Sequence, residues 1–409
     1  MERVIERGAG LDVHKKTVTA CVRVPGLMGE RRQEVQTFGT TASALLALRD
    51  WLQAHGVTHV AMESTGVYWK PVYYVLEELF TCILVNAAHV SKVPGRKTDV
   101  RDCEWLAQLL EHGLLRGSFV PPVAIRELRD LTRYRSVLVQ DRTREVNRLH
   151  KVLTDAGIQL ASVASNVLGK SGRAMLTALV EGTTDPHVLA ELAQGKLRRK
   201  LPALREALVG RFRAHHSLLV SHLLAPLAYL DEALDDLTAQ IEAALRPFAT
   251  EAARLDAIPG VGPRTVEILI AELGVDMRQF PTARHLASWA GLCPGTHESA
   301  GKRRAVRTTK GNHWLRTALI EAALAAVNVR DSALAGRYRR LLPRRGHKKA
   351  IVAVAHKLLT TAYLLLAEGR TYQELGAGYY DARRKDRDVR RALHALERHG
   401  YRVSLEPAA

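Results

Sequence analysis

Two acidic residues, Asp99 and Asp102, stand three positions apart in a basic segment, RKTDVRD, at residues 96–102. On the first turn of a helix, residues with this spacing share a face, with Cβ atoms about 5 to 6 Å apart. Their carboxylates could then share a divalent cation. Two negative charges this close repel each other unless a metal or a cationic side chain neutralises them. The pair is therefore either part of a metal site or the salt-bridged start of an amphipathic helix, where acids ordinarily complement the helix dipole.

Hydrophobic patterning predicts the elements that would position this pair. Apolar and polar residues alternate in three predicted strands, at residues 8–14, 17–24 and 34–38. A helix ending at Gly56, a strand at 57–64, a helix at 67–80 and a strand at 82–86 follow before the RKTDVRD helix. This order, three strands, helix, strand, helix, strand, helix, is that of the ribonuclease H-like (RuvC-like) α/β fold.

Four acids fall at the places where that fold brings acids together. Asp12 lies in the first strand, Glu63 ends the fourth strand, and Asp99 and Asp102 lie on the last helix. The layout would converge them on one edge of the sheet, which favours the metal interpretation. Oxygen ligands without histidine or cysteine select Mg²⁺, or Mn²⁺, over zinc. The implied chemistry is phosphoryl transfer on a nucleic acid, in which metal ions hold the attacking and leaving oxygens.

Composition agrees with a nucleic-acid partner. The 409 residues include 60 Lys and Arg against 42 Asp and Glu, a net charge of +18, which predicts a polyanionic partner. No apolar run approaches the length of a membrane span and the first ten residues lack a signal-peptide pattern. We therefore expect a cytoplasmic, nucleoid-associated protein without a membrane partner. The four cysteines are widely spaced and are predicted to be reduced core thiols. His14 and His89, near the acids, are interpreted as structural.

A long helix is predicted at residues 125–157, after the double proline Pro121-Pro122. Leucines at near-heptad spacing form its apolar seam, and cations coat the remaining surface: Arg126, Arg129, Arg133, Arg135, Arg142, Arg144, Arg148 and Lys151. Charge runs are usually solvated faces, but this one is nearly all of one sign. We therefore predict that Arg129, Arg133 and Arg144 contact a phosphate backbone. A second helix, at about 202–245, would complete an antiparallel coiled-coil arm able to dimerise.

The third region opens with IPGVGP, in which Gly260 and Gly262 lie between two short apolar helices. This is a helix-hairpin-helix pattern, whose backbone N–H groups can bind a phosphate. A Gly-x-Gly turn is also often only a tight connection between helices.

Ser299 lies downstream in a loop of small residues. The cations Lys302, Arg303, Arg304 and Lys310 follow it. A serine hydroxyl becomes a useful nucleophile when a base or metal takes its proton and cations hold the phosphate that it attacks. The cations are present here and no base is evident. Judged by local sequence alone, a loop serine is usually inert.

Together these motifs closely resemble the DEDD-type transposases of the IS110 insertion-sequence family, from about Gly8 to Leu365. The matching segments are GLDVHK, AMESTGVYW, GRKTDVRD, IPGVGP, ASWAGLCPGTHESAGKRR and KGNHWLR. The resemblance implies that Asp12, Glu63, Asp99 and Asp102 bind Mg²⁺ in a RuvC-like domain and that Ser299 attacks DNA. It also implies a homo-oligomer, dimer or tetramer, in which the two domains form a composite site, and a non-coding guide RNA encoded by the element.

We therefore expect four regions: a RuvC-like metal-binding domain at 1–120, a helical arm at 121–250, a mainly helical transposase domain with the helix-hairpin-helix at 251–370, and a basic tail at 371–409. The expected activity is cutting and rejoining DNA through a serine. One alternative is a junction nuclease in which the acids activate water and Ser299 is structural. Another is a non-catalytic nucleic-acid-binding protein, although the presence of all four acids argues against it.

Overall fold

The structure, a computed structural model, describes residues 3–26, 30–64, 66–86, 102–295, 298–299, 302–303 and 308–404, with the backbone alone at 298–299, 302–303 and 381–388. The chain divides into two compact units, Met1–Val120 and Pro121–Ala409.

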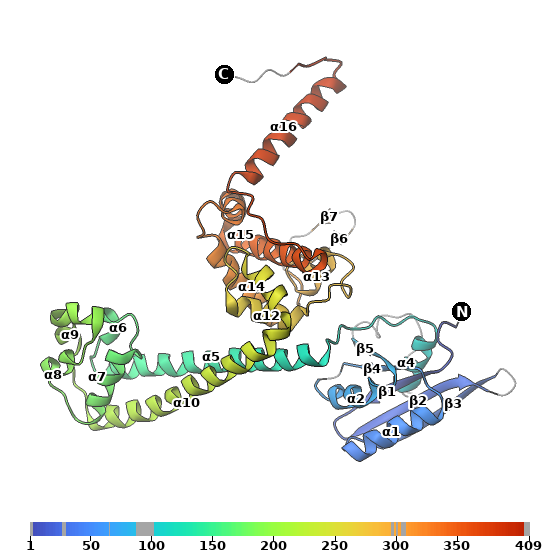
Figure 1. Cartoon of the computed structure of the whole chain (residues 1–409), viewed down its shortest axis with the longest axis horizontal. Coiled ribbons are helices and arrows are strands. Elements are labelled where there is room, and N and C mark those ends of the chain that lie inside the picture. Colours follow the sequence, from blue (N-terminus) through green and yellow to red (C-terminus); the bar gives the residue numbers. More distant parts are fainter. Residues whose placement is uncertain are drawn as a thin grey trace. The chain divides into compact units, whose positions relative to one another are not determined.

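The first unit is a five-stranded sheet with helices on both faces (Figure 1). Its strands are β1 (Gly8–Val13), β2 (Thr17–Pro25), β3 (Arg31–Gly39), β4 (His59–Glu63) and β5 (Thr81–Val85), in the spatial order β3-β2-β1-β4-β5. Its helices are α1 (Ala42–Ala54), α2 (Trp69–Leu76) and α4 (Asp102–Glu111). β2 pairs antiparallel with both β1 and β3, whereas β4 runs parallel to β1 and to β5.

Alternation along β1 assigns each residue to a face, because successive side chains of a strand point to opposite sides. Ala9, Leu11 and Val13 are buried in the core that also includes leucines of α1 and α2. Gly8 and Gly10 face α4 on the other side, where a Cβ on Gly10 would lie 2.2 Å from the Cys103 carbonyl oxygen. The glycine therefore lets α4 pack directly on the sheet.

The predicted element order is confirmed in this unit, with strand ends shifted by a few residues. The third strand is longer than predicted, because Arg31 to Gly39 pair continuously with β2. The described part of the last helix begins at Asp102. Asp99, predicted on the same first turn, lies outside the described residues.

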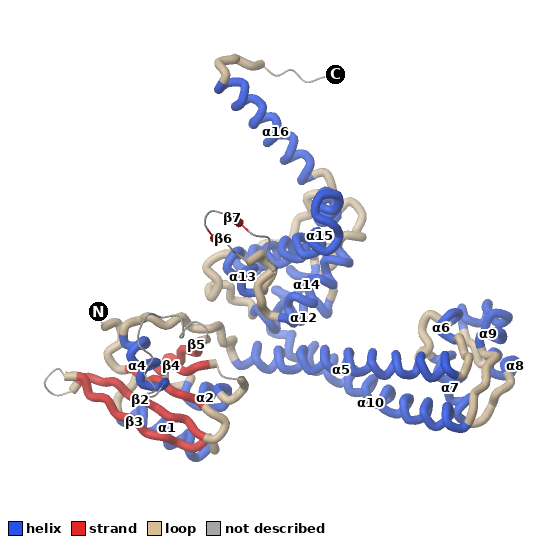
Figure 2. The backbone as a smooth tube through the Cα atoms, turned by 180° about the vertical axis from the view of Figure 1, so that it is seen from behind, coloured by secondary structure: helices blue, strands red, loops and turns tan. Residues whose placement is uncertain are grey.

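The second unit is helical apart from a short ribbon (Figure 2). Its elements are α5 (Val123–Asp155), α6 (Leu160–Val163), α7 (Lys170–Val180), α8 (Pro186–Glu191), η1 (Gly195–Lys200), α9 (Leu201–Ala207), α10 (Ala214–Leu245), η2 (Arg246–Phe248), α11 (Ala249–Asp256), α12 (Pro263–Leu273), α13 (Ala283–Trp289), β6 (Glu298–Ser299), β7 (Lys302–Arg303), α14 (His313–Ala326), α15 (Ala333–Glu368) and α16 (Tyr379–Arg398).

α5 and α10 are the two long helices that the sequence predicts, and they run side by side (Figure 2). α10 begins later than the predicted residue 202, because the helical conformation ends with α9. The backbone then passes the end of α5 before α10 begins. There the Arg211 N–H donates to the Ala156 carbonyl at 2.7 Å, and a Cβ on Gly210 would lie 2.5 Å from the same oxygen. Residues 157–202, which had no clear pattern, form small helices around a leucine-rich core.

The predicted cationic coat of α5 is largely used inside the second unit. Arg133 makes two hydrogen bonds to the Glu272 carboxylate, at 2.7 and 2.8 Å. Arg129 donates to the carbonyl oxygens of Ala271 and Glu272, and buried Arg135 pairs with Glu267. The alternative of a solvated face therefore does not hold at these three positions, and the phosphate contacts of Arg129 and Arg133 remain predictions. The acids that pair with them lie more than 130 residues away, so local sequence gave no sign of them.

This network fixes α5 to the helices that follow it. The Glu272 side chain is 1% exposed, and its carboxylate also accepts the Asn312 side-chain amide at 2.6 Å. Asn312 caps α14 by accepting the Leu315 N–H. Residues 121–250, which include the predicted arm, lie in the compact unit Pro121–Ala409 together with the C-terminal helices.

We expect Glu272→Ala to destabilise the second unit by about 3 kcal/mol, because it leaves Arg133 and Arg129 without the buried carboxylate. Urea denaturation followed by circular dichroism measures the loss. Asp276→Ala is the control, since Asp276 pairs with Arg278 on the surface and an exposed pair contributes less than about 1 kcal/mol. Equal destabilisation by the two variants would contradict a stabilising role for the Glu272 network.

One helix in the described part of the chain, Ala333–Glu368, is long and apolar enough by composition to span a membrane. Half of its most apolar window is buried within the protein. Gly346 interrupts it with non-helical backbone angles, and its buried residues include Ile351, Val354 and Leu358. We assign it as a core helix. The four cysteines are free. Cys21 and Cys103 are buried, as predicted for core thiols, whereas Cys82 and Cys293 are only partly buried.

Candidate active site

Asp12 and Glu63 stand side by side at the ends of two neighbouring strands. β1 and β4 are parallel, and their register pairs Leu11 with Met62. Asp12 and Glu63 are the next residue on each strand, so they occupy equivalent positions about 4.8 Å apart across the sheet. Paired residues on neighbouring strands point to the same face, and Asp12 lies two residues beyond Gly10. Both carboxylates therefore lie on the face that α4 covers.

The close contact at Gly10 places the first turn of α4 beside these acids. Cys103 packs over Gly10, and Asp102 immediately precedes Cys103. Burial raises the pKa of the Cys103 thiol to about 11, and the negative charges of Glu104 and Asp12 add to this rise. The charge of Asp12 acts on Cys103 because the end of β1 lies beside the start of α4.

The structure therefore brings Asp12, Glu63 and Asp102 to one face of one sheet edge. All three are partly exposed. Among the described residues, their carboxylates do not form a group whose ligand atoms all lie within 4.8 Å of one another. The fourth predicted acid, Asp99, lies outside the described residues.

His14 contacts this acidic edge, although sequence analysis set it aside as structural. Its Nε2 lies 3.1 Å from Asp12 Oδ2, and the ring is mostly exposed. Residues two apart at a strand end share a face, so the Asp-Val-His spacing was a signal that could have found this contact. His89, the other nearby histidine, lies outside the described residues.

The donor set at this edge fits a hard divalent cation. Asp12, Glu63 and Asp102 offer carboxylate oxygens, the ligands that Mg²⁺ prefers. The thiol of Cys103, which Asp12 influences, has a raised pKa that keeps it protonated and so unsuited to bind metal. Bound there, such an ion would neutralise the carboxylates and polarise a phosphate.

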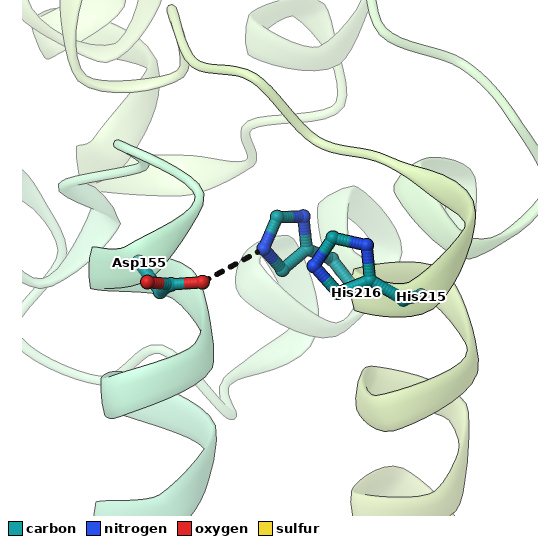
Figure 3. A group of neighbouring side chains, drawn as sticks. All are labelled: Asp155, His215 and His216. Carbon is teal, nitrogen blue, oxygen red and sulfur yellow. Dashed lines mark hydrogen bonds and ion pairs between the residues drawn. The ribbon is translucent and has the colours of Figure 1, made fainter.

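A second group of possible ligands lies in the other unit, where α5 ends and α10 begins (Figure 3). It consists of Asp155, His215 and His216. The His216 Nδ1 accepts the Arg213 backbone N–H at 3.1 Å, so Nε2 of the neutral ring carries the proton that faces Asp155 Oδ2, also at 3.1 Å. Both nitrogens of His216 are thus occupied. We interpret the group as a tie between the ends of the two helices.

Ser299 ends β6, one strand of a two-stranded ribbon, and pairs across it with Lys302. The base of the segment that carries the ribbon is tightly fixed. Pro294 and Thr308 form a β-bridge, and a Cβ on Gly311 would lie 2.3 Å from the Gly291 backbone nitrogen. The matching glycines of the AGLCPG and KGNHW motifs thus allow two backbones to meet. The predicted loop serine lies instead in extended, paired backbone.

The other predicted phosphate-binding residues are in varied surroundings. Lys302 and Arg303 form β7 beside Ser299, Lys310 is exposed at the base of the segment, and Arg304 lies outside the described residues. Arg144 on α5 is mostly exposed and pairs with Asp141 one turn away.

The two glycines of the predicted helix-hairpin-helix connect α11 to α12, with Gly262 as the α12 N-cap. Gly260 is packed against α14, where a Cβ would lie 2.4 Å from the Ala326 nitrogen. A Cβ built on Gly262 would meet no atom of the described residues within 4 Å, apart from those of its chain neighbours. Gly260 therefore serves packing, and Gly262 lies next to open space.

Comparison with known families matches both units. Residues 9–158 match a family model described as a transposase, and residues 252–339 match the model of the transposase IS116/IS110/IS902 family. The first match spans the strands that carry Asp12 and Glu63, and the second spans the ribbon that carries Ser299.

Individual relatives extend the similarity over most of the chain. A probable family 20 transposase of Pseudomonas aeruginosa is 30% identical over 80% of this chain and 89% of its own length. The transposase for insertion sequence element IS1111A of Coxiella burnetii is 27% identical over 71% of this chain and 72% of its own. A pilin gene-inverting protein of Moraxella bovis is 23% identical over 89% of this chain and 97% of its own. By these matches, the chain belongs to the IS116/IS110/IS902 family of transposases, enzymes that cut and rejoin DNA.

Proposed function

We propose that this transposase cuts and rejoins DNA through a covalent link to Ser299, assisted by Mg²⁺, or Mn²⁺, held by Asp12, Glu63, Asp99 and Asp102. The observation that carries the proposal is the in-register placement of Asp12 and Glu63 on adjacent parallel strands, under the same helix that begins at Asp102. The sheet order, with β2 antiparallel to both β1 and β3 and with β1, β4 and β5 parallel, supports a RuvC-like fold for this unit.

The chemical step forms one bond and breaks another. The Ser299 oxygen attacks the phosphorus of a DNA phosphodiester and loses its proton to solvent or a base. The bond from phosphorus to the 3′ oxygen breaks, and that oxygen leaves as a hydroxyl. The serine phosphodiester conserves the energy of the broken bond, so a second 3′ hydroxyl can reverse the reaction on another strand. Such rejoining needs no ATP.

The proposal requires Ser299 and the acids to act on one phosphate, although they belong to different units of the chain. We propose that a dimer or tetramer provides this composite site, with α5 and α10 as a coiled-coil dimerisation arm. We also propose that a non-coding RNA directs the protein to its donor and target DNA, and that it acts in the cytoplasm. The proposal of a guide RNA rests only on the resemblance of the sequence motifs to those of the family.

The competing function is a junction nuclease in which the acids activate water. The two differ in whether a covalent intermediate forms. The test uses the wild-type protein, expressed with its gene's native flanking DNA, where the element ends and guide RNA are expected. Labelled DNA that stays attached to the protein after denaturation supports the serine link. Cleaved DNA with a free 5′ phosphate and no attached protein would favour the nuclease.

Binding of the purified protein to duplex DNA should depend strongly on salt. If about six to ten phosphates are contacted, the affinity falls by about three or more orders of magnitude between about 50 and 200 mM salt. Fluorescence anisotropy at several salt concentrations gives the slope. Arg144→Glu should reduce this slope if α5 contacts phosphate, whereas reversing Arg129 or Arg133 would break the Glu272 network and give no clean test. A flat salt profile would contradict a nucleic-acid partner.

A further inference from the structure

A basic pocket lies in the second unit between the start of α14 and the middle of α15. Its volume is about 660 Å³, and six of its lining residues are basic: Arg316, Arg337, Arg345, Lys348, Lys349 and His356. Its floor is apolar and includes Leu341 and Val352. Pockets of this size with an apolar floor and a few polar groups typically bind a ligand as large as a nucleotide.

The positive charge of this pocket has no acidic counterpart among the described residues that line it. None of the described lining residues is acidic, and the salt bridges of the described part of the chain include none of its five Lys and Arg residues. Arg316 and Arg337 donate to backbone carbonyls at the wall, those of Gly291 and Ala353, both at 3.4 Å. Arg345, Lys348 and Lys349 are exposed at the rim. A concave surface lined by one sign of charge concentrates counter-ions.

The pocket adjoins the base of the segment that carries Ser299. Pro294 and Thr308, which form the bridge at that base, both line the pocket. Ser299 lies five positions after Pro294, so their Cα atoms lie at most about 18 Å apart. That distance corresponds to about five nucleotide steps along a DNA strand. One strand could therefore occupy the pocket and pass Ser299.

We infer that this pocket binds an unpaired nucleotide of the DNA strand that Ser299 attacks, with the rim cations on its phosphate and the apolar floor against its base and sugar. The inference deepens the proposed function and rests on it.

An unpaired nucleotide fits the pocket better than duplex DNA does. A duplex presents phosphates along its outside and cannot place a base on the floor of a cavity, whereas unpaired bases enter protein pockets. Arginine guanidinium planes can stack on such a base, and Arg316 lies at the wall, whereas the Arg337 guanidinium lies over the Tyr380 ring. Burial, followed by the charges of Arg337 and Lys357, lowers the pKa of His356. Its ring is therefore neutral at pH 7 and can accept or donate a hydrogen bond to a base.

The first test removes the rim cations. The pocket variant combines Arg345→Gln, Lys348→Gln and Lys349→Gln. The control variant removes the same charge elsewhere in the unit through Arg284→Gln, Arg330→Gln and Arg339→Gln, all exposed and outside the pocket lining. Anisotropy measures binding of a short fluorescein-labelled oligodeoxynucleotide, single-stranded or annealed into a duplex, to the full-length protein. We expect the pocket variant to bind the single strand at least about tenfold more weakly than the control variant does. The affinities of the two variants for the duplex should agree within about twofold.

The second test fills the cavity without changing charge. Val352→Trp should weaken single-strand binding and leave its salt slope unchanged, whereas Val352→Ile should bind like wild type. Equal single-strand binding by the pocket and control variants would overturn the inference, as would an equally large loss for duplex. If Val352→Trp fails to fold, the pocket variant alone tests whether the pocket binds a single strand, since its three substitutions are at exposed positions. Wild-type protein that binds neither DNA would overturn the proposed function as well.

Discussion

Ser299→Ala should abolish recombination and the covalent protein–DNA adduct while leaving DNA binding near the wild-type value. Alanine removes only the oxygen that would attack phosphorus, and loss of a catalytic nucleophile costs about four orders of magnitude or more. The backbone of Ser299 pairs with Lys302 in a ribbon that alanine can also form. The readouts are polymerase chain reaction across the recombined junction in cells that carry the gene with its flanking DNA, and labelled DNA retained by denatured protein.

Ser288→Ala is a matched control, because Ser288 is an exposed serine on α13 of the same unit. It should recombine at the wild-type level. If Ser299→Ala still nicks DNA in Mg²⁺ and leaves a free 5′ phosphate, water is the nucleophile and the junction-nuclease alternative replaces the proposal.

The second large effect is expected from Asp12→Asn. The amide keeps the shape of the side chain but removes the charge that holds a hard cation. Because Asp12 is one of the two acids at the paired strand ends, cleavage should fall by at least about 100-fold. Strand cleavage with Mg²⁺ or Mn²⁺ and the thermal unfolding midpoint are measured together. Asp99→Asn and Asp102→Asn should behave alike.

Asp50→Asn serves as the control for this series, because Asp50 is an exposed acid on α1 of the same unit and should leave cleavage unchanged. The metal proposal is wrong if Asp99→Asn cleaves and recombines at the wild-type rate in Mg²⁺. A variant that loses activity together with its unfolding transition would instead show that the acid stabilises the fold.

The sequence by itself determined the elements of the first unit and the position of its acids. Alternation along residues 17–24, with a period of two residues, and the short apolar runs at 8–14 and 57–64 predict the strands. The placement of Asp12 and Glu63 at the ends of parallel neighbours then follows from strand order. The long helices were likewise predictable from apolar periodicity, which depends on residues close in sequence.

Only the tertiary structure decided what the charges of the second unit do. Arg129, Arg133 and Arg135 looked like a phosphate-binding coat, but they pair with Glu267 and Glu272, which approach them only after α12 packs on α5. The basic pocket also joins residues from Leu292 to His356 that have no shared periodicity in sequence. Ion pairs and cavities depend on which surfaces meet in space, and local patterns carry no information about residues more than 100 positions apart.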